Sequence, residues 1–186
     1  MSVKYKHSDV YSMYFCTFTC HEWMHLFELT NGYDLVYNWF NILKKDTIEI
    51  VGFVIMPNHV HSILYFPEAC YDLNKILSNG KRFIAYELVN RLEKANDTNT
   101  LTILQNALTE RERKKKQLHK VFKDSFDAKA IITQCFLMQK INYIHNNRVS
   151  RTWMLAKDFI DYAQSSASFY EIQLVRHHRP MHYLDL

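Results

Sequence analysis

The sequence predicts an α+β fold in which helices pack on an antiparallel sheet. Three observations lead to this prediction. Some segments are rich in β-branched and aromatic residues, as strands are, and other segments repeat apolar residues at helical spacing. The two kinds follow one another in the order strand, helix, strand, strand, helix, strand, helix, which is the order of a ferredoxin-like (RRM-like) sandwich with added helices.

The N-terminal part of the chain supplies the first four elements. Tyr11 to Cys20 is rich in aromatic residues and threonine, which is the composition of a strand. Tyr33 to Lys44 repeats apolar residues at the spacing of a helix. Ile48 to Ile55 and Val60 to Phe66 are largely apolar runs on either side of a short turn that contains proline, so we expect a β-hairpin.

The second half of the chain supplies the remaining elements, and its apolar residues are spaced less regularly. Asp72 to Ala95 has one broad apolar face and predicts a long helix, with Gly80 inside it as a weak point or a junction between two helices. Leu101 to Lys116 is also predicted to be helical, and Leu118 to Phe126 to be a short strand. Asp127 to Asn147 predicts a helix that Asp127 caps and that carries apolar residues along one side.

Length and composition indicate one domain over residues 1–186, with a core of about 11–170 and a tail of 171–186. Three glycines and three prolines in 186 residues argue against low complexity. The net charge is 23 − 19 = +4, which suits a polyanionic partner without requiring one. Neither a signal peptide nor an apolar run near the roughly 18 residues of a membrane-spanning helix is visible. The four cysteines contain no CxxC pair, so we expect buried, reduced thiols in a cytosolic protein.

His59 and His61 are the first candidates for chemistry. Residues i and i+2 of a strand share a face, so both imidazoles are expected to point the same way. Imidazole binds divalent metals well, and two of them on a rigid strand form half of a metal site. In a chain with ten histidines, however, two can fall two positions apart by chance.

The predicted helix that ends at Asn147 carries the second group of candidates. Gln139, Tyr143 and Asn147 are spaced four apart and form one polar stripe, with Lys140 beside it and His145 pointing away. A tyrosine on a helix is often only a core residue. With an amide one turn away, two imidazoles and an amide oxygen could hold Mg²⁺ or Mn²⁺ while Tyr143 attacks a phosphate in line.

Two short motifs carry a resemblance to a known group of enzymes. Met56 to Leu64 (MPNHVHSIL) resembles the HUH motif (His, hydrophobic, His) of the single-tyrosine transposases of insertion sequences. Tyr143 to Asn147 (YIHNN) resembles the catalytic helix of their relatives, the REP-associated tyrosine transposases. The similarity extends from about Tyr14 to Tyr170, with weaker echoes at Lys81-Arg82-Phe83, Asp161-Tyr162 and Ser165-Ser166-Ala167.

The resemblance implies roles for these residues. His59 and His61 would be metal ligands for Mg²⁺ or Mn²⁺, Tyr143 the nucleophile, and Asn147 the third ligand, where the insertion-sequence enzymes usually have glutamine. Arg148 stands where related proteins commonly have proline. The implied substrate is single-stranded or hairpin DNA, cut and rejoined through a phosphotyrosine in the bacterial cytoplasm. Relatives act as monomers or as homodimers, so the resemblance leaves both open.

Basic residues concentrate in one stretch. Residues 110–123 hold seven Lys or Arg against two Glu, a balance of 7 − 2 = +5 that exceeds the charge of the whole chain. Such a stretch is either a solvated helix face or a surface that binds phosphates without reading sequence. The C-terminal run Arg176 to Arg179 is either a further contact or a flexible end. The predicted nucleic-acid contacts are Lys114, Lys115, Lys116, Lys120, Arg148 and Arg151.

Two other functions are compatible with the same residues. One is a non-catalytic nucleic-acid-binding domain of this fold, which would bind DNA without cutting it. The other is a metal-dependent phosphoesterase in which the two histidines serve an activated water and Tyr143 is structural. Replacing Tyr143 by phenylalanine separates them, because only a nucleophilic tyrosine forms a covalent adduct.

Overall fold

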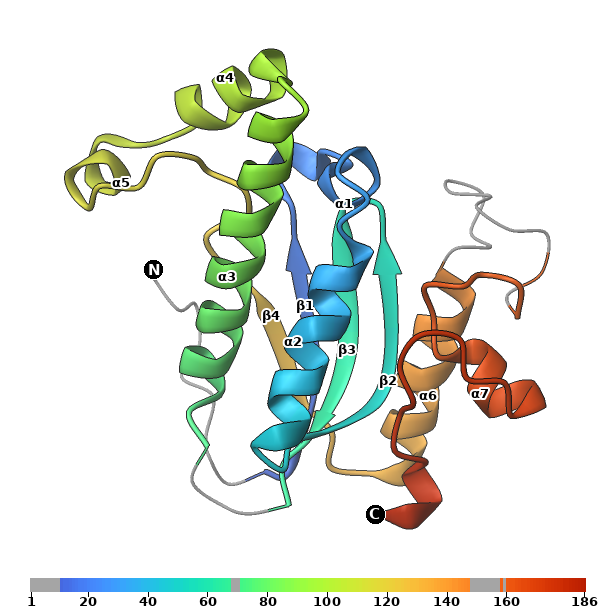
Figure 1. Ribbon diagram of the computed structural model, residues 1–186. Coiled ribbons are helices and arrows are strands. Elements are labelled where there is room, and N and C mark those ends of the chain that lie inside the picture. The colour runs from blue at the N-terminus through green and yellow to red at the C-terminus, as the bar shows by residue number, and fades with distance from the viewer. Residues whose placement is uncertain (1–10, 68–70, 148–157, 159) are drawn as a thin grey trace.

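The structure is a computed structural model that describes residues 11–67, 71–147, 158 and 160–186. Its centre is a four-stranded antiparallel sheet in the order β2-β3-β1-β4 (Figure 1). This is the sheet of a ferredoxin-like sandwich, so the predicted fold class is confirmed. The strands are β1 (Met13–Thr19), β2 (Glu49–Met56), β3 (His59–Tyr65) and β4 (Asp127–Ala130).

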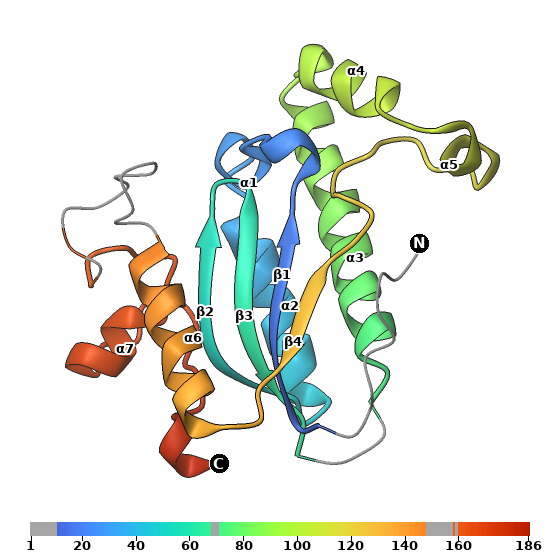
Figure 2. The ribbon, with the colours of Figure 1, turned by 180° about the vertical axis from the view of Figure 1, so that it is seen from behind.

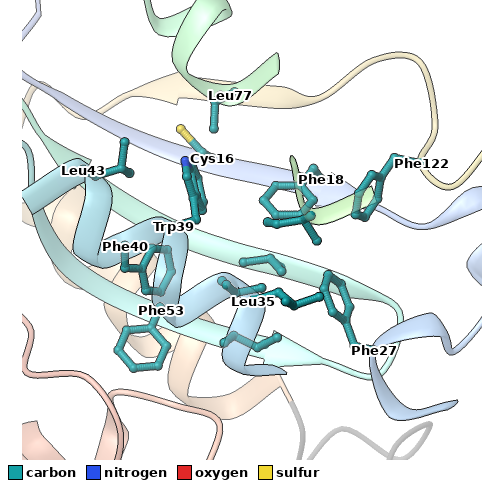
Figure 3. Packing of buried hydrophobic residues seen from close by; sticks show 14 of the residues in the cluster. Cys16, Phe18, Phe27, Leu35, Trp39, Phe40, Leu43, Phe53, Leu77 and Phe122 are labelled. Carbon is teal, nitrogen blue, oxygen red and sulfur yellow. The ribbon is translucent and has the colours of Figure 1, made fainter. Parts of the chain in front are cut away.

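Helices cover both faces of the sheet. On one face lie α2 (Tyr33–Lys45) and α3 (Leu73–Lys94), and on the other α6 (Gln134–Asn146) packs against β2 and β3 (Figure 2). Each face has its own apolar core; that under α2 and α3 is shown in Figure 3. The shorter helices are η1 (His21–Trp23), α1 (Leu26–Leu29), α4 (Thr98–Asn106), α5 (Glu110–Lys114), α7 (Ala167–Ile172) and η3 (Tyr183–Asp185).

α3 runs without a break through Gly80, so the alternative of two shorter helices is wrong. Asp72 caps its first turn by accepting a hydrogen bond from the Lys75 amide at 2.9 Å. A Cβ on Gly80 would lie 2.5 Å from Nε1 of Trp39 in α2. The glycine therefore allows α2 and α3 to approach closely.

Four features of the second half differ from the prediction. Residues 101–116 form parts of two helices, because Thr109 makes a capping box with Glu112 and starts α5 anew. Residues 118–126 are not a strand, and pair only through an isolated bridge between Cys20 and Phe122. The strand is β4, at the residues predicted to begin the last helix, because they pair with β1. Thr133, not Asp127, caps α6.

The C-terminal segment packs along the outer edge of β2. The amides of Ile55 and Ser166 bond to the carbonyls of Gln164 and Phe53 at 2.8 and 3.0 Å, and the Met181 amide bonds to Ile50 at 2.9 Å. His178 is buried against Phe40 and Phe53, and His177 stacks on Tyr37. The flexible-end interpretation of this tail is therefore wrong.

The cysteines only partly match the expectation. Cys16 and Cys20 are buried, and burial raises the pKa of each thiol. Cys135 is exposed on α6 rather than buried, since it faces away from the sheet. Among the described residues, no helix combines the length and the apolar character that crossing a membrane requires.

Candidate functional site

The two histidines lie side by side at the start of β3. Their ring centroids are 4.7 Å apart, and both residues are buried, at 4% and 6% exposure. Val60 between them points into the core under α2 and α3. The strand therefore places both imidazoles on one face of the sheet, as the sequence predicted, and the structure shows that α6 covers this face.

Asn58 fixes the orientation and the tautomer of His59. Its amide nitrogen donates to the carbonyl of Trp23 at 2.9 Å, so its Oδ1 faces Nδ1 of His59 at 2.7 Å. A carbonyl oxygen only accepts, so Nδ1 of His59 carries the proton. The lone pair of this ring is then on Nε2, the atom that a metal would bind.

His61 is held from the neighbouring strand. Thr17 on β1 lies directly opposite it, and the threonine Oγ1 is 2.7 Å from Nδ1 of His61. Phe15, two residues earlier on β1, stacks on the His61 ring at 5.3 Å. When Nδ1 donates to Thr17, Nε2 of His61 also presents a lone pair.

Burial keeps both imidazoles neutral. It lowers the pKa of His59 to about 4. It also lowers the pKa of His61 well below its usual value, with further contributions from His59 and Lys140. Neutral imidazole is the form that ligates metals, so this pair is suited to that role at physiological pH.

Tyr143 reaches the same place from α6. Its ring meets the His61 ring edge-on at 5.2 Å and the Phe15 ring at 5.9 Å. The residue is 48% exposed, so its interpretation as a buried core tyrosine is wrong. Two distant segments, β3 and α6, thus bring His61 and an accessible phenol together.

Lys140 lies one turn before Tyr143 on α6. Its ammonium is 5.5 Å from the centre of the Tyr143 ring and 4.7 Å from that of Phe15. Burial and the charge of Lys129 lower the pKa of Lys140, and Asp127 opposes them. The positively charged Lys140 ammonium therefore lies beside the phenol of Tyr143, on the side away from β2.

Asn147 is the C-terminal cap of α6, one turn beyond Tyr143. His145 points to the other side of the helix, as predicted, where it is buried and its Nε2 lies 3.2 Å from Oγ of Ser166. Within the part of the chain that the structure describes, no three His, Cys, Asp or Glu side chains gather to hold a metal ion. The assignment of Asn147 as the third ligand stays a prediction.

The predicted DNA contacts differ in how accessible the structure leaves them. Lys114, Lys115 and Lys116 are exposed at the end of α5. Lys120 is instead mostly buried and forms ion pairs with Glu112 at 3.1 Å and Asp124 at 3.3 Å, so it ties this segment together. Arg148 and Arg151 lie outside the described residues.

The residues that support the two histidines were not among the candidates predicted from the sequence. Asn58 directly precedes His59 in the MPNHVH motif, and this position could have suggested that it supports the histidine. Thr17 could not be found without the register of β1 against β3. Trp23, whose carbonyl holds Asn58, lies in a segment without periodic pattern.

Comparison with known proteins identifies the fold. No family model matches the sequence, and no curated protein matches it. A REP-associated tyrosine transposase, solved bound to a REP hairpin, is 19% identical; the match covers 90% of this chain and 84% of that chain, with a TM-score of 0.63. A candidate transposase from Deinococcus radiodurans R1 is 15% identical over 78% of this chain and 95% of its own, and its TM-score of 0.42 is too low to establish a common fold. The chain thus has the fold of a REP-associated tyrosine transposase.

Proposed function

We propose that this protein is a transposase of the REP-associated tyrosine transposase kind, which cuts and rejoins single-stranded or hairpin DNA through Tyr143. The observation that carries the proposal is the contact between His61 and Tyr143. The two motifs that resemble these enzymes are far apart in the sequence, and the fold brings them together. The similarity to a hairpin-bound enzyme over most of the chain supports the same conclusion.

The residues present fit a divalent metal ion. His59 and His61 are neutral, adjacent and fixed through their Nδ1 atoms, so their Nε2 atoms are the proposed ligands, with Asn147 as the third. A bound Mg²⁺ or Mn²⁺ would polarise the scissile phosphate and offset its negative charge. The hydrogen bonds from Asn58 and Thr17 would keep both imidazoles in the orientation that ligation needs.

The proposed reaction is a transesterification. Oη of Tyr143 loses its proton and forms a bond to phosphorus, while the bond from phosphorus to one DNA oxygen breaks. That oxygen takes up a proton and becomes a free hydroxyl, and the protein carries a phosphotyrosine ester. Attack by a DNA hydroxyl on this ester reverses the step and rejoins a strand, which needs no external energy source.

Lys140 is proposed to assist the tyrosine. A phenol has a pKa near 10, so forming the phenolate is a barrier at neutral pH. The ammonium of Lys140 over the Tyr143 ring favours the negative charge that develops on the phenol and on the phosphate. Lys140 is half-buried, so part of its side chain remains accessible to the DNA phosphate.

The proposal is tested by incubation with labelled hairpin DNA and Mn²⁺ or Mg²⁺, followed by denaturing electrophoresis. We expect a metal-dependent adduct that is lost in Tyr143→Phe and strongly reduced in His59→Ala. DNA binding without cutting would favour the non-catalytic domain. Cutting that persists in Tyr143→Phe without an adduct would favour the phosphoesterase that uses water.

A further inference from the structure

Trp23 presents a large exposed aromatic surface beside the histidine pair. It is 53% exposed, and its ring meets that of His59 edge-on at 5.8 Å. An indole of this size is usually mostly buried. Here η1, which follows β1, turns it outward, next to one of the two histidines proposed to bind the metal.

The backbone around Trp23 is held in an uncommon conformation. Glu22 and Trp23 have φ angles of 46° and 60°, in the left-handed region that non-glycine residues seldom occupy. Hydrogen bonds secure the segment, from the Trp23 amide to Cys20 at 3.2 Å and from the His21 amide to Val121 at 2.8 Å. The exposed position of the ring is therefore fixed by its surroundings.

A positively charged side chain, that of Lys123, lies over the Trp23 ring. The ammonium of Lys123 lies 4.3 Å from the centre of the Trp23 ring. The Lys123 backbone is anchored at both ends: its amide donates to Thr19 at 2.9 Å, and its carbonyl accepts from the buried ammonium of Lys81 at 2.7 Å. The structure thus positions an aromatic face and a positive charge together.

We infer that Trp23 and Lys123 form a subsite for one unpaired nucleotide of the DNA strand, next to the phosphate that is cut. The inference rests on the proposed function. A nucleotide offers a flat π face for the indole and a phosphate for the ammonium, so it matches both partners at once. A neutral apolar ligand would leave the cation unmatched.

The location supports a nucleotide close to the reaction. His59 touches the Trp23 ring, and the Trp23 carbonyl holds the Asn58 amide that orients His59. The indole side chain takes no part in that hydrogen bond. Replacing the ring therefore removes the stacking surface while the backbone contact to Asn58 remains.

The test measures binding apart from chemistry. Single-stranded oligonucleotides and REP-like hairpins with single-stranded flanks are titrated into the Tyr143→Phe protein in EDTA. Trp23→Ala is compared with Trp23→Phe and with Tyr86→Ala. Tyr86 is a matched control, because it is also an exposed aromatic residue, at 66%, but lies on α3 over the opposite face of the sheet.

We expect Trp23→Ala to weaken binding roughly 5- to 100-fold, the loss associated with one stacked base. Trp23→Phe should retain most of the affinity, and Tyr86→Ala should change it less than about twofold. An abasic nucleotide scanned along the strand should abolish the Trp23→Ala effect at one position only. Equal loss in Tyr86→Ala, unchanged affinity in Trp23→Ala, no DNA binding at all, or an effect that no abasic position removes would each overturn the subsite.

The outcome is distinguishable from failure of the proposed function. If the unmodified protein forms no adduct with any metal, but stacking at Trp23 is found, the chemistry fails and the subsite stands. If Trp23→Ala binds DNA and forms the adduct as the unmodified protein does, the subsite fails and the chemistry stands. Far-UV circular dichroism of each variant confirms that the fold is intact.

Discussion

The ring of Tyr143 meets the ring of His61 edge-on, with the ring centres 5.2 Å apart and the ring planes at 68°. One residue belongs to a helix near the end of the chain and the other to a central strand. The apolar contacts of α6 with β2 and β3 fix this relationship, through Ile141 and Ile144 on the buried side of the helix. The phenol is left half exposed on the other side, where a substrate can reach it.

Thr17→Val should loosen His61 and weaken metal binding. The change keeps the shape of the side chain and removes the oxygen that lies 2.7 Å from Nδ1 of His61. We expect Mn²⁺ affinity to fall about 10-fold or more, as for other residues that orient metal ligands. Titration calorimetry measures it. Thr19→Val, on the same face of β1 opposite His59, is the control, and an equal loss there would argue against a specific role for Thr17.

Lys140→Met should slow formation of the covalent adduct by about tenfold or more, because it removes a positive charge beside the phenol. Lys140→Arg should restore most of the rate, and Lys75→Met, an exposed lysine on α3 over the opposite face of the sheet, should leave it unchanged. The measurement is the single-turnover rate of adduct formation; an unchanged rate in Lys140→Met, or an equal loss in Lys140→Arg, would contradict this role.

Gly80→Ala should destabilise the protein even though alanine favours helices. The new methyl would lie 2.5 Å from Trp39, a buried ring that cannot move away easily. We expect a loss of about 1–3 kcal/mol in the free energy of unfolding, larger than the gain of about 1 kcal/mol from helix propensity. Urea unfolding measures it. Gly52→Ala is the control, because its methyl would meet neighbours at 3.7 Å or more; unfolding of Gly80→Ala at the same urea concentration as the unmodified protein would refute the close contact.

His178 should make the protein less stable at low pH. Burial, with Lys44 nearby, lowers the pKa of His178 to about 4, against about 6.5 in the unfolded chain. Its contribution is complete above pH 6.5 and is lost as the pH falls toward 4, since the unfolded chain then binds the additional proton. In His178→Gln, the slope of unfolding free energy against pH in this window should decrease by up to about 1.4 kcal/mol per pH unit. An unchanged slope would show that His178 is accessible to protons in the fold.

The sequence predicted the order of the main elements and the shared face of His59 and His61, because both follow from simple periodicities. It misassigned β4, whose four residues (DAKA) are few and include none of the β-branched or aromatic side chains typical of strands. That strand exists because its backbone pairs with β1, and pairing between distant segments leaves little trace in local composition. The same limit applies to Thr17, which reaches His61 only through strand register.

The site was predicted in part for a related reason. Helical spacing predicted that Tyr143 and Asn147 lie on one side of a helix. It did not predict that the Tyr143 side chain is exposed, because this depends on where α6 lies over the sheet. Trp23 depends on two consecutive residues with positive φ, and neither is a glycine that would mark such a turn. Lys120 appeared as one more basic residue, and only the fold shows it paired with Glu112.

The most direct test of the central claim is to locate the covalent bond. The protein is incubated with hairpin DNA and Mn²⁺, digested with nuclease and protease, and examined by mass spectrometry for a peptide that carries a nucleotide. We predict that the modified peptide contains Tyr143 and that the nucleotide is joined to its phenolic oxygen. A nucleotide joined to another residue, or cut DNA without a modified peptide, would contradict the assignment of Tyr143 as the nucleophile.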